Sequence, residues 1–134
     1  MSAIYTPKMT TLATSGALTG SYVVQGSVMA SQGRDQGLLL VNYTKGDETS
    51  LELEIQFSDT SAFTDAYQEV VGDTNTSTGV TTPRDRSYTF TASTKKVIPI
   101  QLHGLYWRVR AKATAGTPTG TLSLQTRMEA RQHA

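Results

Sequence analysis

The stretch Leu51-Glu52-Leu53-Glu54-Ile55-Gln56-Phe57 decides the fold class of this 134-residue chain. Apolar and polar side chains alternate along it without a break, and successive side chains of a β-strand point to opposite faces of a sheet. A helix would place Leu51 and Leu53 about 200° apart and would scatter the apolar set around its axis. The stretch therefore predicts a strand that buries its four apolar side chains and turns its polar ones toward solvent or a partner.

Other segments share this period of two or the apolar character of a buried strand. Residues 37–43 form a continuous apolar run, which predicts a central strand buried on both faces. Pro99 has no N–H to donate, so the strand predicted over residues 95–102 is expected at a sheet edge or a bulge. Residues 58–71 favour a short helical turn or loop followed by a strand. The remaining strands are predicted over residues 22–29, 88–91, 105–113 and 121–128, with a hairpin-type turn at 114–120.

Short strands roughly 8–15 residues apart are typical of sandwiches and barrels. We therefore expect an all-β chain: an antiparallel β-sandwich or jelly roll of about eight strands over residues 21–128, with a polar tail over 129–134. Residues 1–20 lack a clean period and are expected to form an extended N-terminal arm or a frayed terminus. Residues 72–87, rich in Thr, Ser and Gly, are interpreted as a long surface loop, and long loops often carry function. The apolar residues with which the arm could contact a neighbour are Ile4, Tyr5, Met9 and Leu12.

Composition limits the chemistry that the chain can perform. It has the length of one domain, carries 12 basic and 11 acidic residues for a net charge of +1, and has no cysteine. The lack of cysteine excludes disulfides, thiolate nucleophiles and Cys-ligated metals, and we expect no cofactor or metal. A net charge near zero argues against direct nucleic-acid binding. Residues 1–20 contain no apolar run of signal-peptide length, so neither a secretion signal nor a membrane-spanning helix is expected.

Catalytic motifs are absent from the sequence. No Gly-x-Ser-x-Gly elbow, His-Glu-x-x-His pair, Walker loop or Rossmann glycine pattern occurs. His103 is expected in a turn and His133 in the polar tail, and neither has a recognisable catalytic companion. The segment that begins at Asp73 starts like a calcium loop, but Thr78 and Arg84 occupy the positions where an EF-hand needs glycine and glutamate. We therefore expect that the chain is not an enzyme.

One basic stripe lies on the outward face of the strand predicted over residues 105–113. It could meet phosphates or an acidic protein surface, or it could be a solvated face that discourages edge-to-edge aggregation. Arg127, on the strand predicted over residues 121–128, would lie beside this stripe if the last two strands pair as a hairpin. Trp107, on the inward set of the same strand, is expected in the core. The candidate partner-binding side chains here are Tyr106, Arg108, Arg110, Lys112 and Arg127.

The two closing segments resemble a known class of protein. They are Leu105-Tyr106-Trp107-Arg108-Val109-Arg110-Ala111-Lys112-Ala113-Thr114 and Gly116-Thr117-Pro118-Thr119-Gly120-Thr121-Leu122-Ser123-Leu124. In a Thr- and Gly-rich chain they look like the final hairpin of a β-sandwich or jelly-roll capsid decoration (cement) protein of a tailed bacteriophage. The resemblance implies a virion protein of the capsid surface, made in the host bacterial cytoplasm. It would bind the major capsid protein or other virion proteins without covalent bonds, often as a homotrimer, and without membrane contact.

Three alternatives remain open at this point. A tail, adaptor or fibre protein of a virion has the same style of sequence. A carbohydrate-binding module would need exposed aromatic rings, for which Tyr22, Tyr43, Tyr67 and Tyr106 are the candidates. A small β-fold hydrolase built around His103 is disfavoured by the missing motifs.

Overall fold

The computed structural model describes residues 8–129, and all of their regular structure is β-strand. The prediction of an all-β chain is therefore confirmed. The strands are β1 (Lys8–Ala17), β2 (Val23–Ala30), β3 (Gln36–Thr44), β4 (Ser50–Ser58), β5 (Tyr67–Gln68), β6 (Val70–Thr74), β7 (Thr81–Asp85), β8 (Tyr88–Phe90), β9 (Thr94–Gln101), β10 (Tyr106–Thr114) and β11 (Thr121–Glu129).

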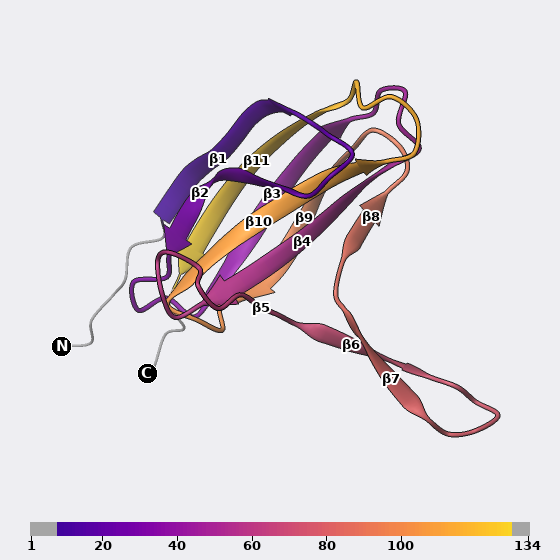
Figure 1. Cartoon of the computed structure of the whole chain (residues 1–134). Coiled ribbons are helices and arrows are strands. Elements are labelled where there is room, and N and C mark those ends of the chain that lie inside the picture. Colours follow the sequence, from indigo (N-terminus) through magenta and orange to yellow (C-terminus); the bar gives the residue numbers. More distant parts are fainter. Residues whose placement is uncertain (1–7, 130–134) are drawn as a thin grey trace.

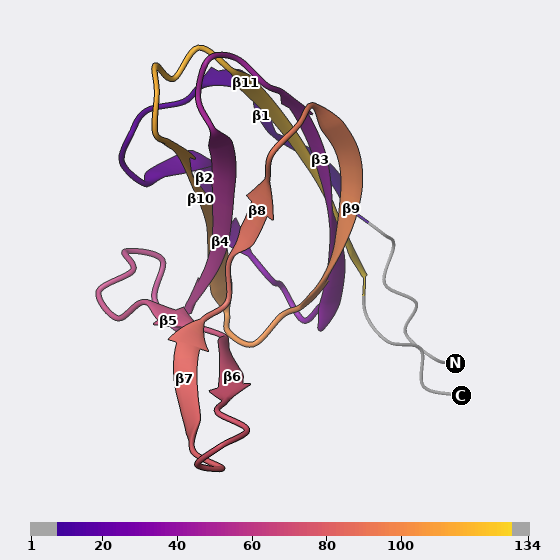
Figure 2. The ribbon, with the colours of Figure 1, turned by 90° about the vertical axis from the view of Figure 1, so that its right-hand side faces the viewer.

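Two antiparallel sheets face each other, as Figures 1 and 2 show. Sheet A has the order β1-β11-β3-β9, and sheet B has the order β2-β10-β4-β5, with β8 also paired to β4. Apart from the step from β4 to β8, the chain crosses from one sheet to the other between its long strands. The molecule is thus the antiparallel β-sandwich that the sequence predicts. β9, which contains Pro99, lies at an edge of sheet A as expected.

The core lies between the sheets and consists of the inward residues of the alternating strands. Leu51 and Leu53 of β4 are fully buried, as are Trp107 and Val109 of β10. The Trp107 indole Nε1 donates a hydrogen bond to the Met128 sulfur of β11, 3.3 Å away. The inward sets predicted for β4, β10 and β11 are therefore confirmed, except that Leu105 lies just before β10 and is exposed.

The last two strands do not form the predicted hairpin. β10 pairs with β2 and β4 in sheet B, whereas β11 pairs with β1 and β3 in sheet A. Residues 115–120 instead carry the chain across the end of the sandwich. They are held to the turn before β4, where the Asp47 N–H donates to the Thr119 hydroxyl at 2.8 Å and the Thr49 N–H donates to the Thr114 carbonyl. Both strands have one apolar face, and stacking the two faces buries both at once.

Three other expectations differ from the structure. Residues 8–17 of the expected arm form the edge strand β1, paired with β11; two register shifts, between Thr11 and Ala13 and between Ala13 and Gly16, break its period of two. Residues 59–66 form a turn without a helix, so only the loop form of that expectation holds. The predicted loop over residues 72–87 is mostly the hairpin β6–β7. Residues 1–7 and 130–134, with Ile4, Tyr5 and His133, lie outside the described residues.

β3 differs from its prediction in a way that bears on function. It lies in the interior of sheet A, as expected, and its inward residues Leu39 and Val41 are buried. Leu38 and Leu40, on the outer face, are only half-buried. The run Leu38–Val41 is therefore apolar on both faces although the folded chain covers only one of them.

A buried carboxylate joins the two sheets at one end of the sandwich. Glu48 is fully buried and accepts hydrogen bonds from the Gly46 N–H at 2.5 Å, the Gly120 N–H at 2.6 Å and the Tyr43 hydroxyl at 2.8 Å. A side chain at Gly120 would meet this carboxylate, since a Cβ there would lie 2.6 Å from its oxygen. Burial alone raises the pKa of Glu48, but the hydrogen bonds from Gly120, Tyr43 and Gly46 stabilise the anion more, and the pKa is lowered.

We expect Glu48→Gln to lower the free energy of unfolding at pH 7 by about 2 kcal/mol, because an amide has one accepting oxygen and leaves a buried N–H facing its own NH₂ group. The folded-state pKa of Glu48 is below its ordinary value, so the ionised carboxylate stabilises the fold above that value. The stabilisation is lost as the pH falls through the folded pKa. Urea unfolding at several pH values should show the gap between wild type and Glu48→Gln closing on acidification.

The neighbouring exposed residue provides the control for this measurement. Asp47→Asn should leave both the stability at pH 7 and its pH dependence nearly unchanged. A gap between wild type and Glu48→Gln that stays constant down to acid pH would contradict the assigned role of the carboxylate.

Candidate functional site

The basic stripe of β10 is paired with acceptor side chains of the strand beside it. Directly opposite Arg108, Arg110 and Lys112, β4 places Gln56, Glu54 and Glu52. Arg110 forms an ion pair with Glu54, whose side chain is 7% exposed, and Lys112 Nζ lies 3.5 Å from Glu52. The Arg108 Nε donates to the Gln56 side-chain oxygen at 2.9 Å. The outer face of sheet B therefore uses its cations to satisfy its own acceptors.

Two aromatic rings cover this network from outside. The Arg108 guanidinium lies 4.4 Å from the centre of the Phe63 ring, which the turn after β4 places over sheet B. Arg110 and Lys112 flank the Tyr22 ring at 5.0 and 4.7 Å. Burial, with the hydrogen bond from its hydroxyl to Glu52, raises the pKa of Tyr22 to about 12. A phosphate or an acidic surface would have to displace these contacts before it met the stripe.

The remaining predicted residues do not join the stripe. Arg127 lies on β11 in the other sheet, exposed on the outer face, opposite Met9 of β1 and Leu38 of β3. Leu12 falls in β1 where the register shifts. Tyr106 lies opposite Ser58 and is half-buried. The predicted set is thus split between two faces of the sandwich.

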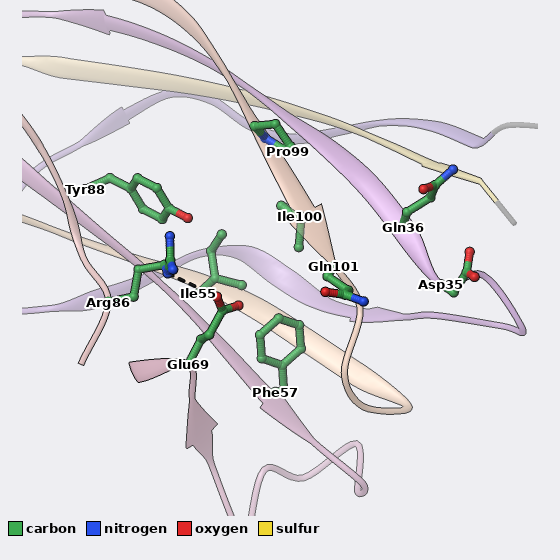
Figure 3. Close-up of a pocket in the computed structure, with 10 residues that line it drawn as sticks. All are labelled: Asp35, Gln36, Ile55, Phe57, Glu69, Arg86, Tyr88, Pro99, Ile100 and Gln101. Atoms are coloured by element: carbon green, nitrogen blue, oxygen red, sulfur yellow. Dashed lines mark ion pairs between the residues drawn. The ribbon is translucent and has the colours of Figure 1, made fainter. Parts of the chain in front are cut away.

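A cleft of about 390 Å³ opens on the side of the sandwich between β9 and the β4–β8 part of sheet B (Figure 3). Arg86 lies between Tyr88 and Glu69 on one wall of the cleft. The opposite wall carries Asp35, Gln36 and Gln101. The Arg86 Nε lies 3.1 Å from Glu69, and His103 Nε2 lies 3.3 Å from the second oxygen of that carboxylate. The apolar lining comes from Ile55, Phe57, Pro99 and Ile100.

The hairpin β6–β7 projects from the end of the sandwich, as both views show (Figures 1 and 2). Its base is closed by a hydrogen bond from the Arg86 N–H to the Glu69 carbonyl at 2.8 Å. Near its tip, the Asn75 side chain accepts from the N–H groups of Ser77 and Thr78, and Gly79 takes a positive φ of 73°. Nearly all side chains from Val70 to Asp85 are exposed, so the hairpin has a defined turn but almost no core.

The outer face of sheet A carries a shallow groove of about 500 Å³. Leu40 and Val97 are cross-strand partners in it, and Leu38 pairs with Pro99 in the next row. Val97 is 55% exposed. Lys95 and Lys96 line the groove beside Val97.

No other protein supplies a function for these surfaces. In comparisons with protein-family models, with curated proteins and with solved structures, nothing matches this chain. Within residues 8–129, no group of three or more His, Asp or Glu side chains is placed to hold a metal ion. The described part of the chain also contains no helix that could span a bilayer.

Sequence reasoning missed the cleft, the hairpin and the groove. The hairpin had a local signal, since Val70-Val71 and Val80 flank a turn that contains Asn75 and Gly79. The groove had a signal in the run of apolar residues in β3, whose outward members need a cover. The cleft had none, because its walls are brought together only by the packing of the two sheets.

The paired charges of sheet B can be tested by removing one cation at a time. Arg110→Ala leaves the nearly buried Glu54 without its ion-pair partner and should lower the free energy of unfolding by about 2 kcal/mol. Lys112→Ala removes a cation from a more exposed pair and should cost about 0.5 kcal/mol or less. Urea unfolding at neutral pH measures both, and equal losses would contradict the difference in burial between the two pairs.

Proposed function

We propose that the protein is a structural component of a virion, a capsid decoration protein that binds the capsid lattice without covalent bonds. The strand order supports the jelly-roll form of the sandwich, in which β1-β11-β3-β9 face β2-β10-β4 and the short strand β8 that pairs with β4. Double-sheet jelly rolls of this kind occur in viral capsid and lectin domains. The partner would be the major capsid protein, and the protein would reside at the capsid surface after synthesis in the bacterial cytoplasm.

The observation that carries this proposal is the projecting hairpin. A two-stranded hairpin is marginally stable in water unless it packs on something. This one has an ordered turn, a Thr74–Thr81 hydroxyl contact at 2.8 Å and an Arg84–Asp73 ion pair at 2.6 Å, yet exposes both Val70 and Val80 by more than half. An element of this kind gains its packing from a neighbouring subunit, which is what a protein that joins parts of a lattice requires.

The proposal predicts that virus particles assembled without this protein will bind the purified protein when it is added to them. Replacement of residues 71–84 by Gly-Gly should keep the sandwich, because Glu69 and Arg86 already pair at the base, and should weaken particle binding more than tenfold. Co-sedimentation with the particles measures the binding, and Val23→Asp, at another exposed valine, is the matched control. Particles that neither contain nor bind the protein would overturn the proposal, and binding only to purified tails would favour the tail or fibre alternative.

The cleft favours a second candidate, a carbohydrate-binding module. Its lining offers donors and acceptors together, from Arg86, Tyr88, Glu69 and two glutamines, above an apolar floor that suits the C–H face of a sugar ring. The aromatic rings named from the sequence support it less. Tyr43 is fully buried, Tyr22 is covered by cations, and only Tyr67 is largely exposed, next to the cleft.

Titration with methyl glycosides of glucose, galactose, mannose and N-acetylglucosamine tests this second candidate. Amide chemical-shift changes should gather at the cleft, with a Kd of about 1 mM or tighter for one sugar, and Gln101→Ala should weaken that binding at least tenfold. Asn42→Ala, exposed on the outer face of sheet A, should leave it unchanged. No shift at the cleft with any of the four sugars would remove this candidate.

A further inference from the structure

The hairpin and the sheet A groove are two apolar surfaces of one chain that the chain itself leaves uncovered. We propose that the β6–β7 hairpin of one copy lies in the groove on the outer face of sheet A of a neighbouring copy. This inference rests on the proposed structural role and names the first partner of the hairpin.

The hairpin has two unlike faces. In an antiparallel pair, residues directly opposite each other share a face, and so do those two positions along. One face carries Val71, Thr82 and the Asp73–Arg84 ion pair. The other, the Val70 face, carries a single charge, that of Asp85. Its members are Val70, Gly72, Thr74, Thr81, Pro83 and Asp85.

The groove complements the Val70 face in polarity and in charge. Its apolar part is the pair Leu40–Val97, which the pair Leu38–Pro99 continues along the same face of the sheet, and its lining includes the cations Lys95 and Lys96. Of the described residues that line the groove, none is acidic. The single carboxylate of the Val70 face would therefore meet a basic rim, and apolar side chains would meet apolar side chains.

The sequence of β3 supports burial of this groove independently of the hairpin. Outer faces of antiparallel sandwiches are usually polar, because alternate residues of each strand face water. Leu38 and Leu40 break that rule at the centre of sheet A, while Val97 and Pro99 break it on the adjacent edge strand. A face of this composition is expected where protein covers it in the assembled state.

The geometry favours a second copy over the same chain as the source of the hairpin. The hairpin points away from the end of the sandwich and so does not lie over its own sheet A (Figure 2). Two copies of sheet A placed face to face would bring Lys95 and Lys96 toward like charges. A hairpin-in-groove contact is made twice in a two-fold dimer, or once per neighbour in a head-to-tail ring whose rotation closes.

Light scattering coupled to gel filtration of the purified full-length chain tests the inference without any virus particle. The wild type should have a mass that is a small multiple of 14.5 kDa at about 0.1 mM. Val70→Asp disables the hairpin and Val97→Asp disables the groove, and each should reduce the mass to that of one chain. Val23→Asp is the matched control, since Val23 is an exposed strand valine outside both surfaces, and should leave the oligomer intact.

Mixing the two disabled variants identifies the pairing. A Val97→Asp chain keeps its hairpin and a Val70→Asp chain keeps its groove, so the mixture should form a dimer although each variant alone is a monomer. Unchanged circular dichroism and thermal unfolding would show that both variants fold. A monomeric wild type, an oligomer that survives both substitutions, or a mixture that stays monomeric would overturn the inference. Particle binding by a monomeric wild type would leave the proposed virion role standing while removing this inference.

Discussion

The buried carboxylate of Glu48 is the interaction on which the arrangement of the two sheets depends. It binds the Tyr43 hydroxyl on β3 and the N–H groups of Gly46 and Gly120, and so joins the turn before β4 to the start of β11. A buried charge is costly unless its acceptors are filled, and here three donors fill them. The Gly120 N–H reaches this charge because the β10–β11 connection crosses between the sheets. Glu48 therefore stabilises the crossover.

The two outer faces of the sandwich differ in how far the chain itself pairs their polar side chains and covers their apolar ones. On sheet B, Glu54 and Gln56 are matched by Arg110 and Arg108, and Phe63 and Tyr22 close over the pairs. Those pairs and ring contacts are made within one chain. Sheet A presents aliphatic side chains and cations outward, so its free energy falls when another surface covers it. Because of this difference, we expect a partner to bind the outer face of sheet A.

Period-two reasoning succeeded in identifying the side chains that face the core, although the outward Glu54 and Gln56 of β4 are buried as well. β4, β10 and β11 were predicted with their inward residues, and Pro99 correctly indicated an edge strand. It failed where pairing depends on residues far apart in the chain. β1 is interrupted by register shifts, and the β10–β11 connection was misread because a turn-rich sequence does not reveal which sheet the next strand enters. The basic stripe was found, but the acidic strand opposite it became visible only with the register of β4 and β10.

The sequence of the run Leu38–Val41 predicts burial on both faces of the strand. This expectation is informative although the single chain covers only one of the two faces. Of this run, the fold buries only Leu39 and Val41. Hydrophobic patterning reflects the state in which a protein functions, so an apolar side chain without a cover in the single chain indicates a cover in the assembly. The hairpin of the same chain exposes Val70 and Val80. A subunit with one uncovered groove and one unsupported hairpin has the two complementary surfaces that a head-to-tail contact needs.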